Sequence, residues 1–501
     1  MALCCLRRGD LWQALVYTER AKARYLADLF EQHARPHEDV WAAWRAKGHN
    51  LAALLGRSGA PRDDTRAIIE QAIAGLPPRS AIVVFNITEE DATIFIVMNQ
   101  HDKQIKATLD PNWQTSPDGR LHVCRLKTLN RIALQNLLVR IEQDGSVSGY
   151  LGDYHAEDRD SDPATWERRF RSTLRRTCEE LSTALLWVVD QVLMSLGVER
   201  LILMPNLGLS LLPLHACPIG CTAGPAYLLD RYEISYAPSF DLLRHAQAQV
   251  QEPARAGHEI LAVANPKKKK LYWADVEVAT IVKLFTCHIT MHQATPEEVL
   301  ELAPAYTYLH FGCHGHFNLA EPLLSALELV PRDLTLAMML PTDPEIRLKL
   351  SRARLVVLGA CEIGMVDFAD LADEAMSLPS GFMLAGAPAV IGTLWRVNDL
   401  ATSMLMEQFY HYHLKGDTAE GPLAPAAALQ RAQIWLRDEV TLEYLLERLE
   451  QHKRSLPSSK KIERMNIDSL QARFSSEHHH NHQARPFDHP WYWAAFTVTG
   501  A

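Results

Sequence analysis

The sequence lacks a hydrophobic run of about 18 residues, the length that a membrane-spanning helix needs. The nearest approach, residues 381–395, is shorter and contains glycine and proline. The N-terminal residues also lack a basic segment followed by an apolar core, so they do not predict a signal peptide. These two absences predict a cytoplasmic protein that does not associate with membranes.

Cysteine and charge of one sign are also scarce. The nine cysteines lack the dense, even spacing of a secreted disulfide scaffold, which favours a reducing compartment. The formal net charge is only -9, so there is no electrostatic case for nucleic acid as the main partner. The lysine run at 267–270 is typical of a polar turn before a helix, and direct nucleic-acid binding is not expected.

Apolar residues, in contrast, make up 48% of the chain, enough for a large core. A chain of this length holds roughly two to four domains. We predict a helical segment at 1–75, which resembles a tetratricopeptide-type hairpin with the small residue Ala14 where two helices approach. An ordinary helical extension packed on the next domain is the alternative. Turn-rich residues 75–80 mark the boundary.

Short strands are expected after this boundary. Runs of β-branched residues at 81–85 and 93–98 predict a hairpin, and further strands are expected at 200–205 and 232–238. The polar stretch 142–166 has no periodicity and predicts a mobile loop. A long helix is then expected from about Trp166 to Leu196.

From Glu259 onward, short apolar runs alternate with helical stretches, which predicts an α/β domain around a mostly parallel, buried sheet. In such sheets reactive groups gather outside the carboxyl ends of the strands. Two strand ends fit this rule: "YTYLHFGCHGH" delivers His314 and "ARLVVLGACEIG" delivers Cys361. If these strands are parallel, both side chains emerge at the same edge.

A histidine and a cysteine at one edge form a candidate catalytic pair. A cysteine attacks a carbonyl carbon as the thiolate, and a neighbouring imidazole both activates it and protonates the leaving amine. His314 precedes Cys361 at a separation close to that of caspases, about 50 residues. The backbone N–H groups of Gly315 and Cys361 would form an oxyanion hole.

The residues around His314 also raise the question of a metal site. His310, Cys313 and His316 are expected to be neighbours of the site, and His310 is expected to be structural because it lies inside the strand. Structural zinc needs four ligands in two well-spaced pairs, which neither this cluster nor residues 215–221 or 477–483 provide. We therefore predict no metal and no cofactor.

Four motifs, taken in order, identify a family: "YLHFGCHGHF", "LVVLGACEIG", "AGAPAVIGTLWRVND" and "HPWYWAAFTVTG". They resemble the CHAT domain, a caspase-like (clan CD) cysteine peptidase module often preceded by tetratricopeptide repeats. The resemblance implies a caspase-like, mostly parallel sheet flanked by helices at 256–501, preceded at 78–255 by an α/β half similar to a pseudo-protease. It also implies that His314 is the general acid/base and Cys361 the nucleophile.

The sequence departs from the family pattern beside the cysteine. Where the family usually has Ser-Ala-Cys-Glu-Thr-Gly, residues 359–364 read Gly-Ala-Cys-Glu-Ile-Gly. The hydroxyls of that pattern are missing here, while its cysteine, glutamate and final glycine are kept.

A substrate pocket is expected from the residues that follow the cysteine. Asp367, Asp370, Asp373 and Glu374 form an acidic cluster, and one or more of them would receive a basic side chain, as in the similar separase-type enzymes. Alternatively, Asp373 and Glu374 cap the helix that is expected to start there. Trp395 and Asp399 match a family signature and are expected to build the pocket wall and the start of the next helix.

These features predict a cysteine endopeptidase that cleaves a protein substrate through a Cys-His dyad. The resemblance implies activation by a partner or signal in bacterial antiviral defence or regulated death. A regulatory protein or ribonucleoprotein would then dock on the N-terminal helices. A CHAT-like adaptor that binds partner proteins and cuts nothing is the main alternative. An acyl transferase that uses the same pair on an ester is a third.

Overall fold

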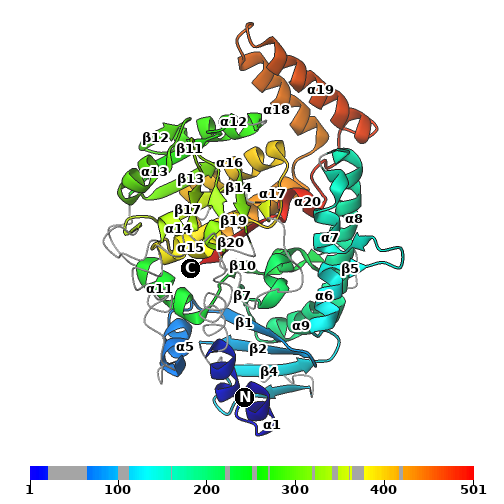
Figure 1. Ribbon diagram of the computed structural model, residues 1–501, viewed down its shortest axis with the longest axis vertical. Helices are drawn as coiled ribbons and strands as arrows, with labels where there is room; N and C mark the ends of the chain where they lie inside the picture. Colours follow the sequence, from blue (N-terminus) through cyan, green and yellow to red (C-terminus); the bar gives the residue numbers. More distant parts are fainter. Residues whose placement is uncertain are drawn as a thin grey trace.

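The structure is a computed structural model in which a central sheet carries helices on both faces (Figure 1). It describes residues 1–20, 65–99, 112–159, 161–220, 226–250, 257–268, 271–318, 322–340, 348–359, 362–363, 377–416 and 421–501.

The central sheet has twelve strands that run through most of the described chain. In spatial order they are β12 (Cys287–Met291), β11 (Glu259–Ala264), β13 (Tyr308–Gly312), β17 (Leu355–Leu358), β19 (Ala389–Thr393), β20 (Phe496–Gly500), β10 (Glu233–Tyr236), β7 (Arg200–Met204), β1 (Ser80–Ile87), β2 (Ala92–Met98), β4 (Leu121–Leu126) and β3 (Trp113–Thr115).

Two parallel blocks make up this sheet. Strands β12, β11, β13, β17 and β19 are parallel to one another, and so are β20, β10, β7 and β1. The blocks meet where β20 pairs antiparallel with β19, and β2, β4 and β3 add an antiparallel edge. The predicted α/β class with a mostly parallel sheet is therefore confirmed.

Helices cover both faces because the strands are apolar on both. In β1, Ala81, Val83 and Phe85 enter one core, while Ile82 and Val84 enter the other. Parallel sheets buried on both sides need such continuous apolar runs.

The helices divide between the two faces according to the core that each one joins. On the first face lie α6 (Arg131–Leu138), α7 (Tyr150–Tyr154), α8 (Pro163–Leu181), α9 (Trp187–Ser195), α10 (Leu228–Arg231), α12 (Tyr272–Ile281), α16 (Asp399–Lys415), α17 (Pro425–Asp438), α18 (Leu442–Ser455), α19 (Lys461–Glu477) and α20 (Pro490–Trp493). On the second face lie α1 (Ala2–Arg7), α5 (Thr65–Ala74), α11 (Phe240–Val250), α13 (Pro296–Leu302), α14 (Leu336–Met339) and α15 (Leu378–Leu384).

The prediction of a mobile loop at 142–166 is wrong. This stretch contains a short hairpin, the helix α7, a 3-10 turn (η1, Glu157–Arg159) and the first turn of α8. Tyr150, Leu151 and Tyr154 are buried in the first core. These few side chains attach the segment to the sheet, although most of its residues are polar. The long helix expected next is present as α8, a π-helical turn (η2, Ser182–Leu186) and α9.

The N-terminal helices pack on the second face. Residues 11–20 are helical, and Leu15 shares a core with Ile69 and Ile73 of α5 and with the strand residue Val84. Residues 21–64 lie outside the described part, so the tetratricopeptide-type hairpin stays a prediction. The three-part division at 1–75, 78–255 and 256–501 also stays a prediction.

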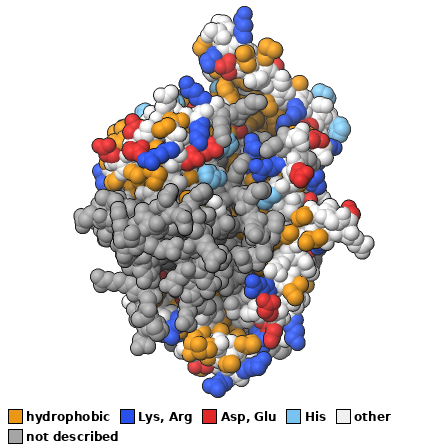
Figure 2. Space-filling model, viewed as in Figure 1, with side chains coloured by type: hydrophobic (Ala, Val, Ile, Leu, Met, Phe, Trp, Pro, Cys, Tyr) orange, Lys and Arg blue, Asp and Glu red, His pale blue; other side chains and the backbone are white. Residues whose placement is uncertain are grey.

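Charges of both signs are interspersed on the face shown in Figure 2, in keeping with the modest net charge. In the lysine run, the ammonium of Lys267 lies 2.6 Å from a carboxylate oxygen of Asp333. An ion pair of this kind suits the predicted polar turn.

The joint between the two blocks yields a stability prediction. Gly500 has a φ of +116°, and a Cβ there would collide with the carbonyl oxygen of Pro388. We expect Gly500→Ala to lower the free energy of unfolding by about 2–5 kcal/mol, measured by chemical denaturation, because strain and overpacking add. The control Gly145→Ala has a φ of +83° and no atom within 4 Å, and should cost only about 1–2 kcal/mol. Equal losses in the two variants would contradict the packing argument.

Candidate active site

The site is built on the carboxyl ends of two neighbouring parallel strands. Strands β13 and β17 pair with Phe311 opposite Leu358, and the N–H of Gly359 donates to the carbonyl oxygen of Phe311 at 2.9 Å. His314 follows Phe311 by three positions, and Cys361 follows Leu358 by three positions. In the sequence, His314 and Cys361 are therefore equally far from the last paired residues of their strands.

A second, small sheet pairs the chain just beyond both positions. It has the order β16 (Leu334–Thr335), β15 (Ala326–Leu327), β14 (Gly315–Phe317) and β18 (Glu362–Ile363). Strand β14 is parallel to β18, with His316 opposite Glu362. The segments that leave the two strand ends therefore come together again directly after His314 and Cys361.

Close backbone approach between the strand ends requires a glycine at 359. A Cβ on Gly359 would lie 3.0 Å from the carbonyl oxygen of Phe311 and 3.6 Å from the Cα of Gly312. A side chain at this position would push the two strand ends apart. The glycine at 359 therefore lets the backbone after β17 lie close to the end of β13.

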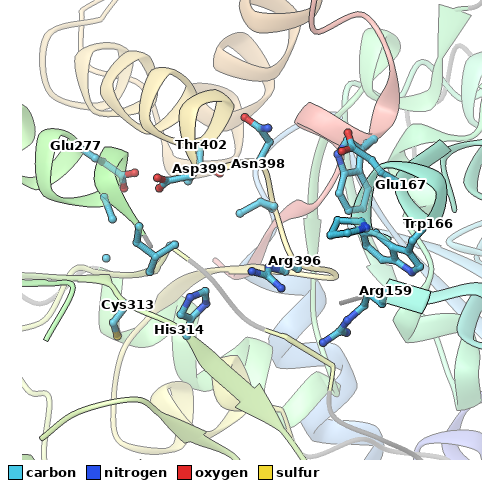
Figure 3. Close-up of a pocket in the computed structure, with 17 residues that line it drawn as sticks. Arg159, Trp166, Glu167, Glu277, Cys313, His314, Arg396, Asn398, Asp399 and Thr402 are labelled. Carbon is cyan, nitrogen blue, oxygen red and sulfur yellow. The ribbon is translucent and has the colours of Figure 1, made fainter. Parts of the chain in front are cut away.

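A cavity of about 420 Å³ opens beside these strand ends (Figure 3). This volume is within the range of about 300–1,000 Å³ usual for ligand pockets. Gly312, Cys313, His314 and Gly359 line it from the sheet edge. Its other walls come from α8, the start of α12, residues 396–402 and Trp491.

Two carboxylates lie at one end of the cavity. Glu277 of α12 and Asp399 of α16 line it, and Figure 3 shows their carboxylates directed toward each other. Burial raises the pKa of the Asp399 carboxyl to about 7, the N–H of Trp273 at 2.7 Å opposes this rise, and the charge of Glu277 adds to it. This end of the cavity is therefore acidic and poorly solvated.

His310 lies inside β13, fully buried, as the sequence predicted. Its Nε2 is 3.0 Å from Oε1 of Glu277, and its Nδ1 is 3.3 Å from the hydroxyl of Tyr410. The Nε2 contact is within ion-pair distance, but neither atom has a hydrogen-bond partner among the described residues. His310 thus packs directly against Glu277 at the acidic end.

Arginine and tryptophan side chains form the opposite end. Arg159, Trp166 and Arg396 line the cavity there, and Figure 3 places His314 between these side chains and the acidic end. Trp395, predicted in the pocket wall, is fully buried and stacks on Trp491 at 6.2 Å. Trp491 itself lines the cavity, so Trp395 lies directly behind it.

Several predicted site residues lie outside the described part of the chain: Cys361, Asp367, Asp370, Asp373 and Glu374. Within the described ranges, no three His, Cys, Asp or Glu side chains are grouped in a way that would hold a metal ion. In the same ranges, none of the helices combines the length and the apolar character needed to cross a membrane.

Sequence reasoning missed Glu277, although its position carries a signal. It lies among the apolar residues Ala274, Val278 and Ile281 on the buried side of α12. A carboxylate on the apolar side of a helix is costly unless it is paired or used. That mismatch could have marked Glu277 from the sequence.

Comparison with known families decides the relationship. The family model of the CHAT domain matches residues 175–501, which is well over half of the chain. The chain belongs to the CHAT domain family. The matched residues contain both strand ends, the small sheet and the acidic end of the cavity, whereas Arg159 and Trp166 precede the matched residues of the CHAT domain.

Solved structures give weaker likenesses. A separase–securin complex of Saccharomyces cerevisiae matches with a TM-score of 0.47 at 9% identity, over 76% of this chain and 31% of that chain. The Arg-specific cysteine proteinase gingipain R matches with a TM-score of 0.36 at 8% identity, over 66% and 67%. For the pro- and mature domains of Porphyromonas gingivalis RgpB the TM-score is 0.32 at 9% identity, over 68% and 70%. The CHAT protein spans about a third of the separase chain. No curated protein matches its sequence.

The buried Asp399 makes stability depend on pH. Its pKa is about 7 in the folded chain and 3.8 as the ordinary value, so between these pH values only the folded state holds the proton. The free energy of unfolding therefore falls as pH rises through this window and stays lower above it. We expect Asp399→Asn to raise it by about 1–3 kcal/mol at pH 8, less than the full shift because the amide is itself buried.

Thermal unfolding at pH 4 and pH 8 measures this difference, which should vanish at the lower pH. The control Asp333→Asn removes a partly exposed ion pair and should change stability by less than about 1 kcal/mol. A loss of stability in Asp399→Asn at pH 8 would mean that the carboxylate acts mainly as a cap of α12.

Proposed function

We propose that this CHAT protein is a cysteine endopeptidase in which Cys361 is the nucleophile and His314 the general acid/base. The observation that carries the proposal is the double pairing around both positions. Phe311 pairs with Leu358 before them, and His316 pairs with Glu362 after them. Neighbouring strands lie about 5 Å apart, so the pairing on both sides supports a close approach of His314 and Cys361.

The chemistry follows from these residue types. The Cys361 thiolate attacks the peptide carbonyl carbon, and N–H groups of Gly315 and Cys361 hold the oxyanion. The C–N bond breaks as protonated His314 gives its proton to the leaving amine, which leaves a thioester. Water then attacks the thioester while His314 accepts a proton, and the carboxylic acid product and the thiol are released.

The acidic end of the cavity favours a basic residue before the scissile bond. Glu277 and Asp399 face each other there within the same cavity that His314 lines. A Lys or Arg side chain would replace the missing solvation of these carboxylates by charge-assisted hydrogen bonds. Two described residues thus take the role that the sequence suggested for Asp367, Asp370, Asp373 and Glu374.

Regulation is the second part of the proposal. Free proteolysis would damage the cell that makes the enzyme, so a partner or signal in a defence or regulated-death system switches it on. The N-terminal helices, which pack on the face of the sheet opposite to α12 and α16, offer a docking surface for a regulatory protein or ribonucleoprotein. The compartment proposed is the cytoplasm.

A covalent probe tests the catalytic pair. We expect a peptidyl acyloxymethylketone with a lysine next to the reactive group to label the full-length protein, with and without candidate partners. Cys361→Ala should abolish labelling, and His314→Ala should slow it about 100-fold or more, because the thiolate loses its base. Intact-mass spectrometry measures the labelling.

The control Cys287→Ala removes an exposed thiol on β12 and should leave labelling unchanged. Labelling that persists in Cys361→Ala, or none under any activating condition, would contradict the peptidase proposal. The second result would favour the adaptor that binds partner proteins without cutting them.

Peptide pairs test the acidic end. We expect a higher kcat/KM for a peptide with lysine before the scissile bond than for the same peptide with glutamine there. Glu277→Gln and Asp399→Asn should each reduce the ratio of these two kcat/KM values about ten-fold. Because the Asp399 pKa is about 7, the ratio should rise between pH 6 and pH 8 in the unsubstituted enzyme and stay flat in Asp399→Asn.

The ionisation of the Cys-His pair affects kcat/KM for both peptides equally, so it cancels in the ratio of the two values. If the lysine preference survives both substitutions, the pocket lies elsewhere. Single substitutions of Asp367, Asp370, Asp373 and Glu374 would then locate it.

A further inference from the structure

A helical hairpin made of α18 and α19 stands out from the body of the protein. Figure 1 shows it extending beyond the sheet and the other helices. Its two helices pack on each other, and Leu449 of α18 joins the same core as Ile467 and Phe474 of α19. We call residues 453–465 the hairpin tip; they comprise the end of α18, the connection and the start of α19.

The hairpin tip carries an excess of positive charge. Its sequence has one carboxylate, Glu463, and five cationic side chains, which are Lys453, Arg454, Lys460, Lys461 and Arg464. Glu463 forms an ion pair with Lys460, and Glu450 and Asp468 reach the tip from its two helices. These five cations therefore face three carboxylates, on a chain whose formal net charge is -9. Exposed ion pairs are weak, so the carboxylate of a ligand competes for such cations.

Two large apolar side chains are exposed among these cations. Ile462 is 73% exposed and Met465 is 66% exposed. They are three positions apart on α19, so they lie on the same side of the helix. Figure 2 shows basic and apolar side chains side by side on the hairpin. The tip therefore matches a ligand that carries both negative charge and an apolar group.

The residue before the tip touches the segment that borders the acidic end of the cavity. Nε2 of His452 lies 2.6 Å from the hydroxyl of Tyr272, and the His452 ring centre is 5.1 Å from that of Trp273. The neighbouring Leu271 lines the cavity, and the N–H of Trp273 donates to Asp399 at the acidic end. One short segment therefore separates the hairpin from the acidic end.

The base of the hairpin is held on the body of the protein. Arg448 of α18 forms an ion pair with Glu407 of α16, the helix that begins at Asp399. Tyr444 meets Trp435 of α17 edge-on, with ring centres 5.9 Å apart. These contacts give the tip a fixed place relative to the acidic end, which lowers the entropic cost of binding there.

We propose that the hairpin tip is a docking surface for the protein substrate, and that it binds an acidic segment of that substrate which carries an apolar side chain. The inference rests on the proposed function, because it gives the same substrate a second contact outside the cavity. Carboxylates suit the lysines and arginines of the tip, and an apolar side chain covers Ile462 and Met465. Glu277 and Asp399 repel an acidic segment, so the cavity and the tip receive different parts of one chain.

The side chains of the tip favour a protein over a nucleic acid. Single-stranded nucleic acids are bound by cations together with aromatic side chains on which the bases stack. Residues 453–465 contain no aromatic side chain, and their exposed large apolar residues are Ile462 and Met465. Aliphatic side chains of this kind suit the apolar side chains of a protein segment.

Peptide binding to the full-length Cys361→Ala protein, measured by fluorescence anisotropy, tests the docking surface. The probe is a labelled peptide of alternating glutamate and leucine. One reference peptide has glutamine in place of glutamate, and the other has serine in place of leucine. We expect the probe to bind about ten-fold more tightly than either reference, and Lys461→Glu and Ile462→Ser each to weaken its binding about ten-fold.

The matched controls are Lys127→Glu and Ile141→Ser, which repeat the same changes at other surface sites. Lys127 is exposed after β4, and Ile141 is 77% exposed on β5 (Arg140–Ile141). Both controls should bind the probe as before. Equal binding of the probe and its references, or unchanged binding in both tip variants, overturns the inference. Tighter binding of single-stranded RNA than of the probe also overturns it.

A joined peptide tests whether the occupant of the tip is the substrate. The glutamate–leucine segment is connected through a Gly-Ser linker of varied length to a segment that contains a lysine. At the best linker length, we expect the joined peptide to bind the Cys361→Ala protein about ten-fold more tightly than either segment alone, because the second contact becomes intramolecular. In the unsubstituted enzyme, joining should lower KM and leave kcat unchanged.

Binding needs no catalysis, so failure of the peptidase proposal and failure of this inference are distinguishable. An enzyme that cleaves nothing but binds the joined peptide more tightly contradicts the peptidase proposal alone. No gain in binding from joining, at any linker length, overturns the assignment of the hairpin tip to the substrate.

Discussion

The parallel pairing of β13 with β17 is the constraint on which the site depends. It aligns two strand ends that are far apart in the sequence, and a glycine at 359 lets the two backbones approach closely. The cavity then forms where α12 and α16 begin, since each follows a strand of the same parallel block. The small sheet through β14 and β18 closes the arrangement from the other side. Loss of this register would move the two strand ends apart, even if every side chain stayed the same.

The two buried carboxylates at the acidic end lower the stability of the fold. Glu277 is nearly excluded from solvent, and Asp399 holds its proton near neutral pH because burial penalises the charge. His310 and the N–H of Trp273 compensate only part of this cost. A core built for stability alone would place apolar side chains here. A positively charged ligand group would supply the hydrogen bonds and the charge that Glu277 and Asp399 lose when they are removed from water.

The sequence predicted best what periodicity controls. The hairpin at 81–98 and the parallel strands up to β19 follow from apolar spacing, and His310 was correctly assigned to the interior of its strand. The prediction for residues 142–166 failed because the buried side chains of Tyr150 and Tyr154 hold this segment in place. Composition alone does not reveal such tertiary contacts. Trp166 and Glu277 reach one cavity from helices far apart in the sequence. Only the folded chain brings those two side chains together.

Strand β20 has a consequence for the order of folding. It is made after every other strand, yet it lies between β19 and β10 and supplies the joint between the two parallel blocks. Neighbouring Trp491 lines the cavity and packs against Trp166, which is translated much earlier. Such long-range closure is slow compared with local helix formation. A nascent chain in which β20 has not yet emerged therefore lacks both the joint and one wall of the cavity.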